Sequence, residues 1–279
     1  MAFTEGRAMD AQGVRGDGFL RRMGLVWFLV ALVGQAAFIV YTFGFYGPRT
    51  FTGEWERWND AQLITGFVEG QLLWNIVFAS HVILAGVITA GGVVQLIPWL
   101  RRNAGWFHRW NGRVFIVVAY VMALGGMAAT WWRGSYLSPI SGINVALNGA
   151  LILVCATMAM RLAMARQFEA HERWAMRTFM VVNGVWFFRL GLMAWVLINQ
   201  GPRGMNDTLS GPADIALQFS SYLVPLLVLE LYQAAKRSSS SAAKTLASGL
   251  MVVATLVTAI GVFGAVSFMW WPRLMMPFP

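Results

Sequence analysis

Two of the three histidines in this 279-residue sequence stand in similar, arginine-rich surroundings. His108 lies in FHRWNGR and His171 lies in HERWAMR. Imidazole is the usual protein ligand of haem iron, and arginine side chains neutralise the haem propionates or bind phosphate. One interpretation is therefore a haem b site in which His108 and His171 are the axial ligands and Arg101, Arg109 and Arg113 hold the propionates. A quinone is the other redox cofactor that such a site would suit.

The same residues also suit a ligand without redox chemistry. The three arginines and two helix N-termini would hold the phosphate of an anionic lipid or another small ligand. In the second loop, His171 and Trp174 share one helical face while Arg177 lies on another, so we count Trp174 and Arg177 as candidate ligand-binding residues. A third interpretation is that both histidines are polar residues of the membrane surface and bind nothing.

A second candidate site lies deeper in the apolar part of the chain. His81 is about 14 Å and Arg189 about 16 Å into their segments, at 1.5 Å per residue. A charge at that depth costs at least about 2.5 kcal/mol, so Arg189 requires partners. His81 is too far from His108 and His171 to complete a three-histidine metal site. On other segments, the polar residues within reach of Arg189 are Gln35, Asn148, Tyr222 and Glu230.

The composition places these residues in a lipid bilayer. The chain is 58% hydrophobic and 12% charged, whereas soluble proteins carry about 25% charge. The net charge of +9 is read as loop charge, because no polar stretch is long enough to form a nucleic-acid-binding surface. The single cysteine, Cys155, excludes a disulfide within the chain. Motifs of soluble hydrolases, kinases and dehydrogenases are absent, and whether the protein is an enzyme stays open.

Seven apolar segments are long enough to cross a bilayer, which predicts an all-α integral membrane bundle. Residues 1–22 form an N-terminal arm and residues 272–279 a C-terminal tail on one transmembrane domain, 23–271. The predicted helices are 23–46, 72–100, 114–132, 143–165, 178–200, 214–235 and 246–271.

The distribution of positive charge predicts the orientation. With the N-terminus inside, fifteen Lys and Arg residues fall on the cytoplasmic side and five outside, and short basic loops resist translocation. We therefore expect a cytoplasmic N-terminus in a bacterial-type inner membrane. The five outer residues are Arg49, Arg57, Arg133, Arg203 and Arg273.

An internal repeat accompanies the two histidine loops. RWNGRVFIVV at 109–118 and RWAMRTFMVV at 173–182 share six of ten residues at an offset of 64. The helical hairpins 72–132 and 143–200 would then be parallel copies of each other. The alternative is that Trp and Arg recur at any inner membrane boundary.

These motifs resemble those of a bacterial family of multi-spanning membrane proteins of unknown function. The family carries a His in an early helix, a Gln at a helix end, an Arg, an HRxxGR loop and later an HxxWxxR loop. Glu172 and Ala175 depart from the HRRWM that is common in its second loop. A more distant similarity is to di-haem b-type membrane cytochromes. The matching residues are His81, Gln95, Arg101, His108, Arg109, Gly112, Arg113, His171, Trp174 and Arg177.

The expected function is that of a polytopic inner-membrane protein that is redox-associated or binds a ligand at the cytoplasmic His and Arg residues. One alternative is a small-molecule or ion transporter that uses a pocket at His81 and Arg189. Another is an accessory or assembly subunit of a membrane complex. The expected partners are membrane lipids and other membrane subunits, with no nucleic acid.

Overall fold

The structure is a computed structural model that describes residues 2–61, 65–132, 134 and 136–276, with side chains from residue 18 onward. All regular secondary structure in these residues is helical, which confirms the prediction of an all-α bundle. The long helices are α1 Ala2–Tyr41, α3 Leu72–Gln95, α5 Gly105–Trp131, α6 Pro139–Met164, α7 Phe168–Val182, α8 Gly184–Ile198, α9 Pro212–Arg237 and α10 Ser241–Gly264. The short elements are η1 Thr42–Tyr46, α2 Gly47–Thr52, η2 Trp55–Ala61, α4 Pro98–Asn103, η3 Ala265–Trp270 and α11 Trp271–Leu274.

Six of the described helical segments are long and apolar enough to cross a membrane. Helices α7 and α8 are long and apolar enough only when taken together, and they meet at an angle of 54°. If they count as one broken span, the chain crosses the membrane seven times. Our expectation of one helix over 178–200 is therefore wrong: the chain breaks at Asn183. The expected helix 72–100 also ends early, at Gln95. Pro98 starts the separate helix α4, because proline disfavours helical geometry in the residue before it, and Ile97 is extended.

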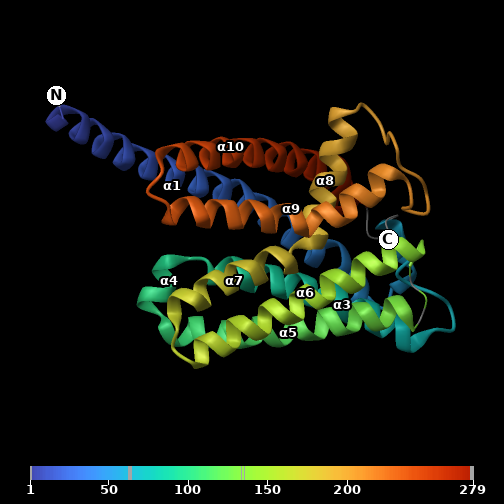
Figure 1. The fold of residues 1–279 in the computed structure, drawn as a ribbon. Coiled ribbons are helices and arrows are strands. Elements are labelled where there is room, and N and C mark those ends of the chain that lie inside the picture. Colours follow the sequence, from blue (N-terminus) through green and yellow to red (C-terminus); the bar gives the residue numbers. More distant parts are fainter. Residues whose placement is uncertain (1, 62–64, 133, 135, 277–279) are drawn as a thin grey trace.

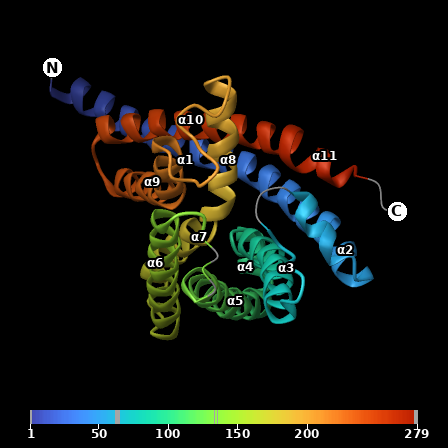
Figure 2. The same cartoon turned by 90° about the vertical axis from the view of Figure 1, so that its right-hand side faces the viewer.

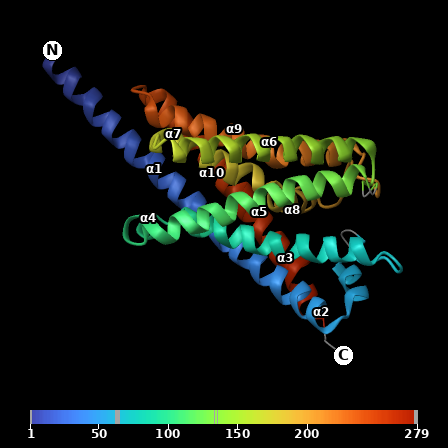
Figure 3. The ribbon, with the colours of Figure 1, turned by 90° about the horizontal axis from the view of Figure 1, so that it is seen from below.

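The helices form two groups (Figure 1). α3, α5, α6 and α7 pack in sequence order, while α1, α9 and α10 form the other group. α8 crosses from the first group to the second, as the view along the bundle shows (Figure 2). α1 runs obliquely to α3, α5 and α6 (Figure 3).

The chain termini lie at opposite ends of the bundle (Figure 1). The end that holds the N-terminus also holds α4, the turn between α6 and α7 and the turn between α9 and α10; we call it the N-terminal end. The opposite end, with η2 and the C-terminus, is the C-terminal end. The loops that carry the predicted cytoplasmic charges therefore meet at one end.

Apolar side chains fill the interior and also cover much of the surface. Ala119, Cys155 and Val181 lie in the core of the first group, and the second group has an aromatic core around Tyr41 and Trp270. Large apolar side chains on the outer faces remain exposed, as a protein surrounded by lipid requires. Examples are Val33 (64% exposed), Val117 (60%), Leu246 (75%) and Phe263 (61%).

Candidate functional site

An amide side chain connects the end of α3 to the first turn of α5 at the N-terminal end, and we call this connection the elbow. Gln95, the last residue of α3, donates through Nε2 to the backbone oxygen of His108 at 2.9 Å. Gly112 leaves room for this contact, since a Cβ there would lie 2.8 Å from Nε2 of Gln95. Asn111 donates to the Gly91 oxygen at 2.8 Å. Three residues of the predicted motif, Gln95, His108 and Gly112, are thus in contact, and the side-chain oxygen Oε1 of Gln95 is buried without a hydrogen-bond partner.

The two histidines lie in the first turns of α5 and α7, at the same end of the bundle. Nδ1 of His171 lies 2.9 Å from the backbone oxygen of Ala159 in α6. This contact fits a proton on Nδ1 and leaves Nε2 free to accept or to bind a ligand. His108 is half-buried, and the charges of Arg101, His171 and Arg109 act on it. The fold therefore brings the two histidine loops together.

A loose ion pair also connects the two loops. Arg101 of α4 lies 3.4 Å from Glu172 of α7, with the two side chains 52% and 60% exposed. Pairs this exposed contribute at most about 1 kcal/mol. The contact nevertheless gives a partner to Glu172, a residue that departs from the pattern of the resembled family.

Arg177 forms the most tightly bonded pair at this end. Its Nε and Nη2 donate to the two carboxylate oxygens of Glu230 in α9, at 2.6 and 2.8 Å. Its guanidinium also lies 4.7 Å from the ring centre of Trp174. We expected Glu230 to be within reach of Arg189, but the structure engages it with Arg177 instead. Arg177 and Trp174 thus tie α7 to α9, which joins the two helix groups.

The surface of α4 and the start of α5 is both basic and aromatic. Arg101, Arg102, Arg109 and Arg113 are exposed. Arg113 lies 5.0 Å over the ring of Trp110. Three tryptophans project from the same surface: Trp99 (63% exposed), Trp106 (64%) and Trp110 (59%). Tryptophan and basic side chains in this combination are typical of a membrane–water interface.

The polar residues that we expected around Arg189 instead lie at the break between α7 and α8. Gln35 of α1 donates to Oδ1 of Asn183 at 3.1 Å. Asn148 of α6 and Tyr222 of α9 flank Gly184, with Nδ2 of Asn148 2.9 Å from the position of an added Cβ. Asn183 also donates to the Phe179 oxygen at 2.8 Å, and so caps the end of α7. These contacts hold the break and explain why none of the three serves Arg189.

Arg189 faces Phe38 of α1 and is close enough to Arg273 of α11 to interact with it electrostatically. Its guanidinium lies 5.4 Å from the ring centre of Phe38, and the groups that act on its charge are Tyr46, Tyr41 and Arg273. Arg189 in turn acts electrostatically on His81, which faces Gly126 of α5. His81 and Arg189 therefore interact electrostatically, and a pocket that they share stays a prediction. His81 is fourteen residues, or about 21 Å of helix, from the elbow at Gln95.

The structure thus separates the candidate residues into two regions, one at the N-terminal end and one around Arg189. Within the described residues, no group of three or more His, Cys, Asp or Glu side chains is arranged to hold a metal ion. No role for Tyr41 was predicted from the sequence, and Arg273 was predicted only to be one of the five basic residues on the outer side. The dipeptide Pro-Arg at 48–49 and again at 272–273, each after an aromatic run, was the available signal.

Taken together, these features define an integral membrane protein built as a bundle of apolar helices with polar sites between them. A family described as "Predicted membrane protein (DUF2306)" matches residues 78–232, more than half of the chain, and the chain belongs to this family. This confirms the resemblance seen in the sequence. The match includes both histidine loops and Arg189, but neither α1 nor α10. No curated protein and no solved structure matches the chain.

Proposed function

We propose that this membrane protein binds the head group of an anionic phospholipid at its N-terminal end. The observation that carries the proposal is the exposed surface of α4 and α5, where Arg101, Arg102 and Arg109 lie beside Trp99 and Trp106. Arginine binds phosphate through paired N–H groups, and tryptophan anchors a surface at the level of lipid head groups. The distribution of Lys and Arg along the chain supports the cytoplasmic face of a bacterial-type inner membrane as the location of this surface.

His108 and His171 extend this surface inward. The nearby positive charges of Arg101 and Arg109 favour an anion beside His108. Nε2 of His171 remains available because Nδ1 faces the Ala159 oxygen. A phosphate held between the α4 arginines and the first turns of α5 and α7 would also meet the free N–H groups of two helix N-termini.

Lipid exchange tests this proposal. The protein, purified in detergent, is equilibrated with a mixture of phosphatidylglycerol and phosphatidylcholine, and the lipid that stays bound is counted per chain. Each basic residue near an anionic surface contributes about 1 kcal/mol, so Arg101→Gln with Arg109→Gln should reduce the preference for phosphatidylglycerol at least about tenfold. Arg203→Gln, which removes an exposed charge at the other end, is the matched control. No preference in the parent protein would refute the proposal.

A specific contact favours a second candidate, binding of haem b between the two histidines. Histidines that bind metals usually donate their other ring N–H to a backbone oxygen or a carboxylate, as His171 does toward Ala159. The absorption spectrum of the purified protein tests this candidate through the Soret band. His108→Ala or His171→Ala should then remove the band, while His81→Ala keeps it. A quinone would give no Soret band and is detected by solvent extraction instead.

A further inference from the structure

Two arginines near the C-terminal end have no acidic partner within the described part of the chain. The ion pairs found there are those of Arg57, Arg101 and Arg177, and none involves Arg189 or Arg273. Each of these two arginines donates to the backbone oxygen four residues earlier, Arg189 to Val185 at 3.5 Å and Arg273 to Met269. Nε of both is buried without an acceptor. Positive charge in a membrane-spanning segment requires compensation.

Two other buried hydrogen-bond donors lie at the same place, and Tyr41 and Trp270 are each only 1% exposed. The Trp270 indole nitrogen has no hydrogen-bond partner, and the Tyr41 hydroxyl interacts with that of Tyr46 and with no acceptor of another kind. Their rings stack with centres 6.2 Å apart. Phe38, which lies under Arg189, is 5.4 Å from Trp270. Tyr41, Arg189 and Arg273 act on one another electrostatically. The region therefore has an excess of donors and of positive charge.

The local sequence explains how Arg273 reaches this place. Pro272 has no N–H to bond the oxygen four residues earlier, and the chain before it widens into the π-helix η3. The Arg273 side chain donates to an oxygen of that π-helix. The first span ends in the same way: η1 precedes Pro48, and Arg49 donates to the Phe45 oxygen at 2.8 Å.

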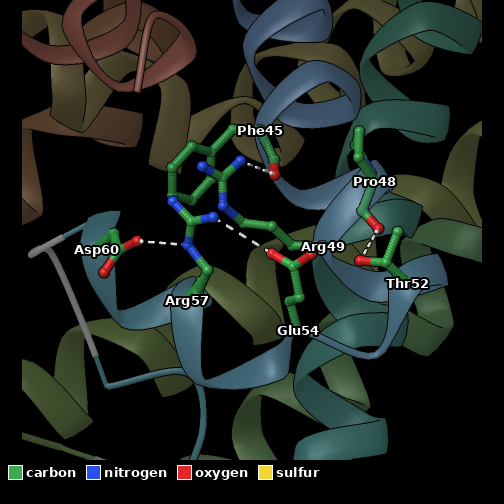
Figure 4. A network of polar contacts seen from close by, with 7 residues as sticks. All are labelled: Phe45, Pro48, Arg49, Thr52, Glu54, Arg57 and Asp60. Carbon is green, nitrogen blue, oxygen red and sulfur yellow. Dashed lines mark hydrogen bonds and ion pairs between the residues drawn. The ribbon is translucent and has the colours of Figure 1, made fainter. Parts of the chain in front are cut away.

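The two Pro-Arg ends differ in their electrostatic surroundings. The positive charge of Arg57 and the negative charges of Asp60 and Glu54 act on Arg49, and both carboxylates are paired with Arg57 (Figure 4). Arg49 also stacks on Phe45, 4.1 Å from its ring centre. The positive charges of Arg49 and Arg57 together are thus matched by two carboxylates, whereas no described carboxylate is paired with Arg273. Arg49 is therefore an internal control for Arg273.

We propose that Arg189 and Arg273, together with the Tyr41 hydroxyl and the Trp270 N–H, bind an oxyanion. The ligand is a carboxylate or a phosphate group, either as a free small anion or as part of a lipid. Guanidinium groups bind both of these through paired N–H donors, and phenol and indole donors complete the oxygen shell. Tyr41, Trp270 and Arg273 lie outside the part of the chain that matches the family. This site is independent of the lipid surface at the other end.

Binding of labelled acetate and labelled phosphate to the detergent-purified protein tests the proposal. The parent should bind one of them saturably, at about one per chain. Arg189→Gln and Arg273→Gln should each weaken binding at least tenfold. Arg203→Gln, at the same end, should retain the parent affinity within twofold. Arg49→Gln should weaken binding far less than Arg273→Gln, although the charge of Arg49 also acts on Tyr41. Arg101→Gln with Arg109→Gln should also retain it, which separates this site from the proposed lipid surface.

A second arm distinguishes the source of the anion. If neither free ion binds, the parent is tested in phosphatidylglycerol and in phosphatidylcholine vesicles. Selective binding of phosphatidylglycerol that Arg273→Gln abolishes and Arg49→Gln preserves identifies a lipid phosphate. Absence of binding in every arm, or equal losses in Arg49→Gln and Arg273→Gln, would overturn the proposal.

Thermal unfolding in anion-free buffer shows whether a variant that has lost anion binding is still folded. Arg189→Gln and Arg273→Gln remove a charge that the protein leaves uncompensated, so they should unfold at or above the parent temperature. Acetate or phosphate should then stabilise the parent and not these variants. A lower unfolding temperature without anion would show that the protein itself compensates these charges, and this would also overturn the proposal.

Discussion

At the scale of single residues, Arg177 and Glu230 form the shortest ion pair among the described residues. The pair is bonded through two N–H groups, at 2.6 and 2.8 Å, and the two side chains are 20% and 37% exposed. Other described pairs are no closer than 3.3 Å. Because the paired residues come from α7 and α9, this interaction fastens the unit that carries the histidine loops to the second helix group.

We predict that Arg177→Leu destabilises the protein because it leaves the carboxylate of Glu230 half-buried and alone. Charge-assisted hydrogen bonds contribute about 1.5 to 3 kcal/mol, and partial exposure reduces the expected loss to about 1 to 2 kcal/mol. The double variant Arg177→Leu with Glu230→Leu should recover much of this loss, since no lone charge remains. Unfolding of the parent, Arg177→Leu, Glu230→Leu and the double variant in detergent gives the coupling energy between the two side chains. Additive losses would show that the two residues do not act as a pair.

The residues of the N-terminal site could be predicted from the sequence, but the partners of Arg189 could not. His108 and His171 each precede an apolar run, so any fold with alternating spans brings them to one end. The direction in which Arg189 points depends instead on the break at Asn183. Beyond this bend α8 leaves the first helix group, and Arg189 meets Phe38 of α1 instead of Glu230 of α9.

At the scale of elements, the contact between α8 and α10 depends on a glycine. A Cβ added at Gly261 would lie 2.6 Å from the backbone oxygen of Leu190 and 2.8 Å from its Cβ. Small residues allow helices to approach closely in membranes, where packing drives association. This close approach positions α8, and therefore Arg189, against the second helix group.

Gly261→Ala should destabilise the bundle by about 1 to 3 kcal/mol, because the clash is with backbone and cannot be relieved by a side-chain rotation. Gly249→Ala in the same helix is the control: nothing lies within 4 Å of its added Cβ. It should be neutral or stabilise by up to about 1 kcal/mol through helix propensity. Thermal unfolding in detergent measures both. Equal effects of the two substitutions would show that α10 does not pack against α8 in this way.

The apolar segments predicted the spans well, because a bilayer requires long helices whose backbone groups are all bonded. They did not predict the break. The two repeated sequences, RWNGRVFIVV and RWAMRTFMVV, are both helical, yet α5 continues through Ala119 while α7 ends before Asn183. The stabilising contact comes from Gln35, 148 residues away in the chain. Local sequence does not reveal a contact that depends on packing of the first span.

At the scale of the whole molecule, the side of the membrane on which the loops after α8 lie depends on how α7 and α8 cross it. If they form one broken span, the chain crosses seven times and its ends lie on opposite sides. If they enter and leave on the same side, every later loop changes sides. Broken helices are tolerated at membrane depth when their polar groups are bonded inside the protein, and Asn183 is bonded in this way.

Labelling of single cysteines in intact cells tests this arrangement most directly. Arg203, between α8 and α9, and Ser239, between α9 and α10, are both exposed, whereas the native Cys155 is buried. With a cytoplasmic N-terminus and seven crossings, a membrane-impermeant maleimide should label Arg203→Cys from outside. Ser239→Cys should be labelled only after the membrane is opened. Labelling of Ser239→Cys but not Arg203→Cys in intact cells would contradict the account.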